Sequence, residues 1–260
     1  MKALLIASLL SVGTLGNVCL AADMAQPGPA PGEPGWTFEA TAYGWFAGLS
    51  GDVGVRGLPP ASLDISPIDV INALDAIPVM GSLTARNGDW SIMGEIIWVK
   101  LAAEANFGPA NGEISYRQTQ LLASGVVGYD LPLNLPEGMD LTATAGFRYN
   151  HIKATLDVSP ALFPVTISRE GSVDWIDPTI GLAFNYKIND RWFMNLTGDI
   201  GGFGVGSDFT TQGIATVGYM WTPTISTSIG WRALYTDYSE GGFVYDTTEQ
   251  GLYTTIGVRF

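Results

Sequence analysis

His151 is the only histidine in this 260-residue sequence and therefore the only candidate for an imidazole base. Ser168 and Asp174 are plausible neighbours across a predicted hairpin, and a serine, a histidine and an aspartate in contact can hydrolyse esters or amides. No nucleophile motif surrounds His151, and single histidines are common on protein surfaces. We therefore predict that the protein is not an enzyme, and a surface hydrolase that uses His151 is the least favoured of our hypotheses.

Metal and cofactor chemistry has even fewer candidate residues. Cys19 is the only cysteine, which excludes a disulfide framework and a cysteine-rich metal site. The single histidine excludes a multi-histidine metal centre. We expect no cofactor and no metal site.

The composition excludes other classes of function. Lys and Arg number 12 against 25 Asp and Glu, so the formal net charge is −13. This balance argues against nucleic acid as a partner, because such binding depends on Lys and Arg at phosphates. Hydrophobic residues make up 47% of the chain and charged residues 14%, against about 25% charged in ordinary soluble domains.

The N-terminus has the organisation of an exported protein. Residues 1–22 combine a positive start, an apolar core and small residues around the expected cleavage after Ala21 or Ala22, which is the pattern of a secretory signal peptide. A lipoprotein with lipidated Cys19 is the disfavoured alternative. Residues 23–35 are rich in Pro and Gly and predict an exposed periplasmic lead segment, and residues 36–260 predict one domain.

Apolar residues recur with the period of two that is typical of strands. At the C-terminus, Leu252, Ile256, Val258 and Phe260 share one face, and Gly257 and Arg259 share the other. The polar faces contain mostly Gly, Ser, Thr and Asn rather than Lys and Glu, and aromatic residues gather at strand ends. A soluble sandwich also alternates, but aromatic girdles favour a membrane barrel.

Turn signals divide the domain into ten extended segments, with eight strands as the alternative. The predicted strands are residues 36–50, 78–86, 89–103, 114–130, 139–156, 165–187, 191–202, 209–221, 224–238 and 250–260. Short connections alternate with longer ones at 51–77, 104–113, 157–164, 203–208 and 239–249. Short periplasmic turns and longer outer loops are typical of outer-membrane barrels. We therefore predict an all-β, antiparallel up-and-down transmembrane barrel with both termini in the periplasm.

The chain resembles small bacterial outer-membrane β-barrel proteins of the uncharacterised proteobacterial kind. The residues that carry the resemblance are Gly198–Asp208, Trp175–Gly181, Gly230–Arg232 and Ile65–Trp90. Phe260, with Val258 and Ile256 before it, resembles the signal that the barrel-assembly machinery reads, although simple anchoring at the interface would explain it too. The resemblance implies the fold and an outer-membrane location in a Gram-negative bacterium, and it implies almost nothing about activity.

Several charged residues are predicted to point into the lumen, because alternate residues of a strand face the same side. They are Glu39, Arg86, Glu95, Arg148, Asp199, Arg232 and Arg259. Charges of both signs in a narrow barrel should pair, since an uncompensated buried charge is costly. Inward Tyr43, Trp45 and Phe193 would take up further space. We favour a salt-bridged, largely closed lumen, and the alternative is a narrow porin-like channel for ions or small solutes.

One short helix is predicted in the first outer loop. Ser66 is an expected N-cap, Pro67 occupies the first helical position and Asp69 the third, and Ile68, Ile71 and Leu74 follow on one face. The helix is either a surface helix or a plug over or in the barrel mouth. We favour the plug, because an isolated amphipathic turn has nothing to bury its apolar face against.

Acidic residues also collect in the predicted outer loops: Asp64, Asp69, Asp75, Asp237, Glu240, Asp246 and Glu249. We interpret them as a solvated rim. The alternative is that they bind divalent cations that bridge to anionic lipopolysaccharide, although no loop has the spacing of a calcium site.

Our leading hypothesis for function is a structural or surface-interaction role of an integral outer-membrane barrel. The expected partners are outer-membrane lipid and lipopolysaccharide, with the barrel-assembly machinery during biogenesis. The oligomeric state is not predicted.

Overall fold

The computed structural model describes residues 35–54, 60–107, 112–159 and 167–260. Ten strands form a closed antiparallel barrel, which confirms the predicted fold class. An extra strand, β2 (Ala61–Ile65), and a short helix, α1 (Pro67–Asn72), lie between the first two barrel strands. The barrel strands are β1 (Thr37–Gly54), β3 (Val79–Asn87), β4 (Trp90–Phe107), β5 (Gly112–Asp130), β6 (Met139–Ser159), β7 (Ile167–Lys187), β8 (Trp192–Gly201), β9 (Phe209–Met220), β10 (Ile225–Glu240) and β11 (Phe243–Arg259).

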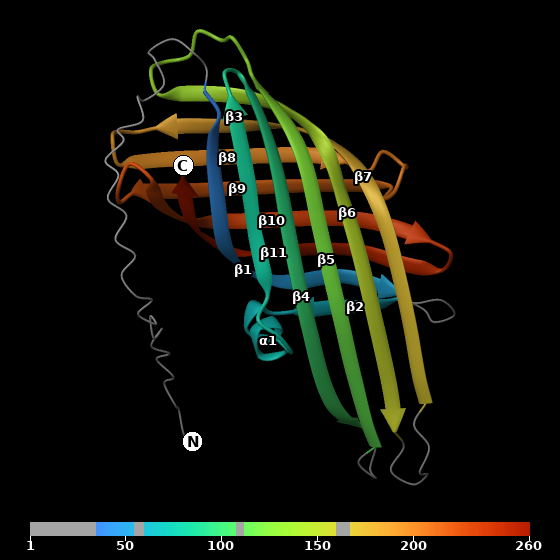
Figure 1. Ribbon diagram of the computed structural model, residues 1–260. Coiled ribbons are helices and arrows are strands. Elements are labelled where there is room, and N and C mark those ends of the chain that lie inside the picture. Colours follow the sequence, from blue (N-terminus) through green and yellow to red (C-terminus); the bar gives the residue numbers. More distant parts are fainter. Residues whose placement is uncertain (1–34, 55–59, 108–111, 160–166) are drawn as a thin grey trace, which may run out of the picture. The chain divides into compact units, whose positions relative to one another are not determined.

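The barrel closes where β11 pairs with β1, from Glu39 opposite Arg259 to Gly54 opposite Val244. Every other barrel strand pairs with its neighbours in the chain, which closes the barrel, while residues 167–177 of β7 extend beyond the short strand β8 and pair only with β6. Strands β4 to β7 run side by side as a long sheet, and β8 to β11 with β1 complete the wall (Figure 1). The alternating sequence explains this architecture, because one face of each strand faces outward and the other faces the lumen.

The hairpin between β10 and β11 differs from the prediction. Residues 239–249 are not a long loop, because the ladder continues to Glu240 opposite Phe243. Gly241 and Gly242 form the two-residue turn with φ of 59° and 87°. Positive φ at both central residues is what a tight hairpin turn requires. As a result, β11 starts seven residues before the predicted start of the last strand, at Phe243 instead of residue 250.

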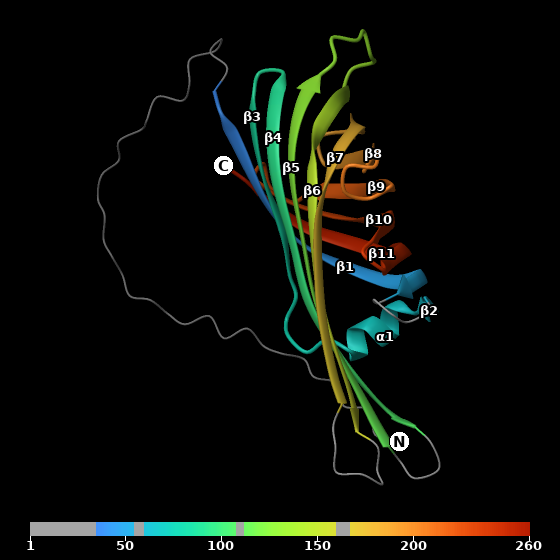
Figure 2. The same ribbon diagram turned by 90° about the vertical axis from the view of Figure 1, so that its right-hand side faces the viewer.

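The β2–α1 segment fills a gap in the barrel wall. The short strand β3 pairs with β1 only as far as Ala42, and β2 then occupies the edge of β1 from Leu49 to Val53. Beyond α1, the Ala73 carbonyl accepts from the Ala102 N–H at 2.7 Å, and the Asp75 N–H donates to the Lys100 carbonyl at 3.0 Å. The segment thus links β1 to β4 where β3 is absent (Figure 2).

The predicted plug helix, α1, is present, but none of its residues is buried. The predicted cap is present, with Ser66 and Asp69 forming a reciprocal capping box. However, α1 has no buried residue, and the side chains of Ile68 and Ile71 are 68% and 44% exposed. Leu74 forms an isolated bridge to Leu101 of β4. The sequence pattern did identify the helix, but the exposure of Ile68 and Ile71 gives no support for their packing inside the lumen.

The outward face carries the apolar surface of a membrane protein. Along β4, the outward residues run from Trp90 through Ile92 and Ile96, all exposed, to Trp98. This span of nine residues equals one crossing of a bilayer by a tilted strand. Other exposed aromatic residues on this face are Trp36, Phe38, Phe46, Phe147, Trp192, Phe209, Trp221, Trp231 and Phe260, most of them near strand ends. Among the described residues, no helix is long and apolar enough to cross a membrane.

A closed antiparallel barrel with an even number of strands, an apolar exterior and aromatic residues at its borders belongs in the outer membrane of a Gram-negative bacterium. The protein is therefore an integral outer-membrane β-barrel. The turn between β3 and β4 and the C-terminal end of β11 lie at the end that we assign to the periplasm, because the outer ends carry the longer connections.

Candidate functional site in the barrel lumen

An ion pair between Arg232 of β10 and Glu95 of β4 crosses the middle of the lumen. Arg232 Nη1 lies 2.6 Å from Glu95 Oε1, and Nη2 lies 3.0 Å from Oε2. The Arg232 side chain is fully buried and that of Glu95 is 8% exposed. Two parallel hydrogen bonds between a guanidinium and a carboxylate form the strongest geometry available to such a pair. Arg232 also donates to Gln212 Oε1 at 2.7 Å.

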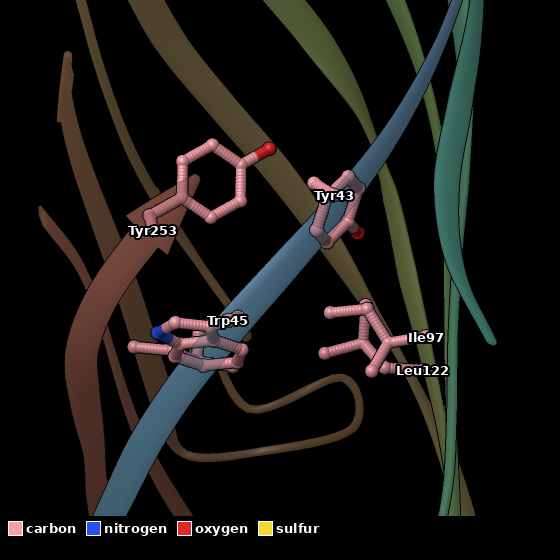
Figure 3. Close-up of a cluster of buried hydrophobic side chains, with 6 residues drawn as sticks. Tyr43, Trp45, Ile97, Leu122 and Tyr253 are labelled. Atoms are coloured by element: carbon pink, nitrogen blue, oxygen red, sulfur yellow. The ribbon is translucent and has the colours of Figure 1, made fainter. Parts of the chain in front are cut away.

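Aromatic rings enclose this ion pair. The guanidinium carbon of Arg232 lies 4.8 Å from the Trp45 ring centroid and 5.9 Å from those of Tyr43 and Tyr253. The Tyr43 hydroxyl donates to Glu95 Oε1 at 2.6 Å. Figure 3 shows these rings on β1 and β11, with Ile97 and Leu122 approaching them from β4 and β5. Side chains from opposite walls therefore meet across the lumen.

A second ion pair lies next to the first. Arg148 of β6 donates to both carboxylate oxygens of Asp199 on β8, at 2.8 and 2.9 Å, and to Thr210 at 3.1 Å. Gln212 donates to Asp199 Oδ2 at 3.2 Å while it accepts from Arg232. One amide therefore joins the two pairs into a single network that spans β4, β6, β8, β9 and β10.

An aromatic layer lies closer to the outer mouth. Trp175 of β7 stacks on Tyr238 of β10 with ring centroids 4.2 Å apart, and Tyr245 of β11 lies 6.0 Å from Trp175. All three rings are buried. Burial raises the pKa of Tyr238, which lies beyond the membrane-spanning part of β10, to about 12. This layer lies between the ion-pair network and the outer mouth.

Beside this layer, the turn after β8 contacts the fully buried Asp177 of β7. Asp177 accepts from the Ser207 N–H and hydroxyl, at 2.6 and 2.8 Å, and from Trp175 Nε1 at 2.9 Å. A Cβ on Gly206 would lie 2.4 Å from the Ile176 carbonyl oxygen, so the approach requires glycine. Sequence reasoning missed Asp177 and Ser207, although the alternation along β7 places Asp177 on the same face as Trp175.

A vestibule of about 910 Å³ lies at the opposite, periplasmic end of the barrel. Its lining includes Thr84, Asn185, Trp192 and Phe193. Its charged lining residues are largely paired: Arg259 with Glu39 at 2.8 Å, and Lys187 with Asp190 at 3.1 Å. Arg86, also in the lining, lies 3.6 Å from Asp130. The vestibule therefore carries charges of both signs.

The structure thus places the seven predicted lumen charges at two levels. Glu95, Arg148, Asp199 and Arg232 form the buried network, whereas Glu39, Arg86 and Arg259 lie at the periplasmic end. The partner of Arg86 is Asp130, which sequence reasoning did not consider.

Phe260 stacks on Phe38 at 5.9 Å and exchanges backbone hydrogen bonds with it, while Val258 and Ile256 face outward.

His151 lies on the outward face of β6, directly opposite Asp174 of β7. Ser168 of β7 pairs with Asp157 instead, six residues further along β6, which is roughly 20 Å away at the rise of a strand. The structure therefore does not bring the serine to the histidine and aspartate. Among the described residues, no group of three or more His, Cys, Asp or Glu could hold a metal ion.

The predicted acidic rim divides into two environments. Glu249 points into the lumen, where Tyr245 donates to it at 2.6 Å and Gln120 at 3.0 Å, so its assignment to an outer loop is corrected. Asp246 lies between Asp237 and Asp52 in the ladder. Partial burial and the nearby Asp246 and Asp208 carboxylates raise the pKa of Asp237, which lies beyond the membrane-spanning part of β10.

Comparisons with known proteins find bacterial outer-membrane proteins among solved structures, but no family model and no curated protein matches the chain. The translocator domain of the autotransporter NalP from Neisseria meningitidis is 12% identical, with a TM-score of 0.48, over 86% of this chain and 88% of that chain. Ail of Yersinia pestis is 15% identical with a TM-score of 0.32, over 88% and 99%. Neisserial surface protein A is 15% identical with a TM-score of 0.30, over 86% and 97%.

Proposed function

We propose that this outer-membrane barrel does not conduct and that its role is structural or in interactions at the cell surface. The observation that carries the proposal is the Arg232–Glu95 pair, whose side chains are 0% and 8% exposed in the middle of the lumen. A water-filled pore would hydrate both charges. Burial among Tyr43, Trp45 and Tyr253 instead indicates that water is excluded at this level.

The energetics of the network also support a closed lumen. Separating a buried ion pair leaves uncompensated charges, and removing one partner of such a pair costs about 3–5 kcal/mol. Opening the lumen at this level would require Arg232 to leave both Glu95 and the Trp45 ring. The Trp175–Tyr238 stack would still close the outer mouth. Two barriers in series make spontaneous opening rare.

Solute release from vesicles tests the proposal. The refolded barrel would be inserted into vesicles loaded with a small sugar or a dye, with a general porin as the positive control. We expect release no faster than from protein-free vesicles. Rapid release of either solute would refute the closed lumen and would favour a channel.

A narrow channel for ions or small solutes is the second candidate, and the periplasmic vestibule favours it. A space of about 910 Å³ with paired charges of both signs could admit small solutes as far as the central ion pair. In that case the Arg232–Glu95 pair would act as a constriction. Release of the sugar would indicate a channel for small solutes, and single-channel recording tests whether ions pass.

We further propose that the C-terminal residues serve as an assembly signal. Phe260 is 68% exposed, and Ile256 and Val258 face outward on the same strand. Their side chains are thus accessible to the barrel-assembly machinery. Replacing Phe260 with Ala should slow assembly in cells more than it slows spontaneous refolding into detergent, and equal slowing in both would argue for simple anchoring.

A further inference from the structure

Basic side chains on the outward face gather on three neighbouring strands just beyond the apolar band. Lys100 of β4, Thr119 of β5 and Lys153 of β6 occupy consecutive positions in one cross-strand row. Arg117 of β5 lies in the next outward row, two residues farther from the membrane centre. Neighbouring strands are about 4.8 Å apart. The backbone positions of Lys100, Arg117 and Lys153 therefore lie within roughly 10 Å of one another.

Lys100, Arg117 and Lys153 face outward, as the alternation of side chains along their strands shows. Ile97, Leu122 and Ile152 are buried on the lumen side of the same strands, and Lys100, Thr119 and Lys153 have the opposite parity. The side chains of Arg117 and Lys153 are 61% and 48% exposed. Among the described side chains, no other Lys or Arg faces outward beyond the apolar band.

The row begins at the membrane border. Trp98 ends the apolar band of β4, and the Lys100 ammonium lies 5.3 Å from the Trp98 ring centroid. A tryptophan at the headgroup layer with a lysine directed from it toward the polar side is typical of a membrane interface. Lys153 lies in the same row as Lys100, and Arg117 lies two residues farther along the strands, away from the apolar band.

The outer end on the opposite side of the barrel carries outward acids without outward cations among its described residues, whereas the cations of β4 to β6 lie among the outward acids Asp157, Glu170 and Asp174. Asp52, Asp246 and Asp237 face outward on β1, β11 and β10. Among the described residues beyond the apolar band, outward cations occur only on β4, β5 and β6, in a chain with a formal charge of −13. Long strands run side by side at this location (Figure 1).

We propose that Lys100, Arg117 and Lys153 bind the phosphate groups of lipopolysaccharide in the outer leaflet. This glycolipid carries phosphates at more than one depth, which matches cations at successive heights, whereas a phospholipid carries its phosphate at a single depth. Arg117 contacts Asp157 at 2.9 Å and Lys153 contacts Glu170 at 2.7 Å. Such exposed ion pairs contribute at most about 1 kcal/mol, so a phosphate can displace the carboxylates. The proposal does not depend on whether the lumen is closed.

The test compares binding of lipopolysaccharide to the refolded full barrel and to two matched triple variants in detergent. The first variant is Lys100→Gln, Arg117→Gln and Lys153→Gln. The control removes three cations at the periplasmic end, as Lys187→Gln, Arg191→Gln and Arg259→Gln. A heat-dependent shift in electrophoretic mobility would verify that each barrel is folded. We expect at least tenfold weaker binding by the first variant and no change in the control, since each surface cation contributes about 1 kcal/mol to anionic lipid binding.

Two further probes identify the chemistry. Dephosphorylated lipopolysaccharide should bind the unmodified barrel as weakly as the intact glycolipid binds the first variant. Phosphatidylglycerol should bind more weakly than lipopolysaccharide. The proposal is overturned if the first variant keeps full affinity, if dephosphorylation has no effect, or if phosphatidylglycerol binds equally well. Vesicle release reports on the lumen separately, so failure of one proposal is distinguishable from failure of the other.

Discussion

Arg232 and Glu95 are 137 residues apart in the sequence and form two hydrogen bonds of 2.6 and 3.0 Å across the barrel lumen. The two residues lie on β10 and β4, which are not neighbours in the sheet, so their contact forms only when the barrel closes. It joins β10 to β4 through the interior, whereas the backbone ladder joins them only around the circumference. The pair thus links opposite walls of the barrel through its interior.

Removing only one member of this pair should destabilise the barrel strongly. We expect Arg232→Met to lower the free energy of unfolding by about 3–5 kcal/mol, because Glu95 remains buried without its partner. The double variant Arg232→Met with Glu95→Met should recover most of that loss, since apolar replacement of a whole buried pair is often neutral. Urea unfolding in lipid vesicles measures both. Equal losses in the single and double variants would show that the pair does not act as a unit.

The Arg148–Asp199 pair should contribute more to the free energy of unfolding than the Arg259–Glu39 pair at the periplasmic end. Arg148→Ala leaves Asp199 without its bidentate partner in a buried network and should also cost about 3–5 kcal/mol. Arg259→Ala removes a pair whose side chains are 54% and 35% exposed, and should cost about 1 kcal/mol or less. The two unfolding midpoints measured side by side check this ranking. Similar midpoints would contradict a dry, closed lumen.

The turn after β8 should tolerate no side chain at Gly206. A Cβ there would meet the Ile176 carbonyl at 2.4 Å and Asp177 Oδ1 at 2.7 Å. Gly206→Ala should displace the turn and break the Ser207–Asp177 contacts, with a loss of roughly 1–3 kcal/mol. Gly213→Ala is the control, because no atom lies within 4 Å of the added Cβ. A Gly206→Ala barrel as stable as the control would show that this contact contributes little.

Asp237 should make stability depend on pH in a predictable direction. Its pKa is raised in the folded state, so the protonated form is favoured there, and this stabilisation is lost as pH rises through the raised pKa. Asp237→Asn should therefore raise stability at neutral pH by roughly 0.2–1 kcal/mol at low salt, because Asp246 lies directly opposite. Below the ordinary aspartate pKa, this advantage should disappear.

Unfolding of Asp237→Asn across pH 3 to 8 provides the check, with exposed Asp75→Asn as the control. If Asp237→Asn is still more stable than the unmodified barrel at low pH, the gain in stability does not come from removing the carboxylate charge.

The strands were predictable because period-two alternation and turn signals are local properties of the sequence. The parity that puts Arg148 and Arg232 on inward faces follows from the same pattern. The choice of partner does not, because Arg148 meets Asp199 and Arg86 meets Asp130 only once strand register is set. Parity alone leaves every inward acid available to every inward base.

The remaining differences also arise from long-range geometry. The wall position of α1 depends on how far β1 and β4 extend beyond the short strand β3, which no local pattern encodes. Glu249 was assigned to a loop because the prediction did not place a tight turn at Gly241 and Gly242. With that turn, the strands on both sides continue and include Glu249. The contact of Ser207 with Asp177 requires the turn after β8 to fold against β7.

Single-channel recording of the refolded mature barrel in a planar bilayer is the decisive measurement. Insertion would be verified separately by the heat-dependent mobility shift and by protease resistance. A lumen filled by the Arg232–Glu95 pair and by the Trp175–Tyr238 stack predicts a silent membrane at moderate voltage. Steady conductance steps from the unmodified protein would contradict the closed lumen and establish a pore.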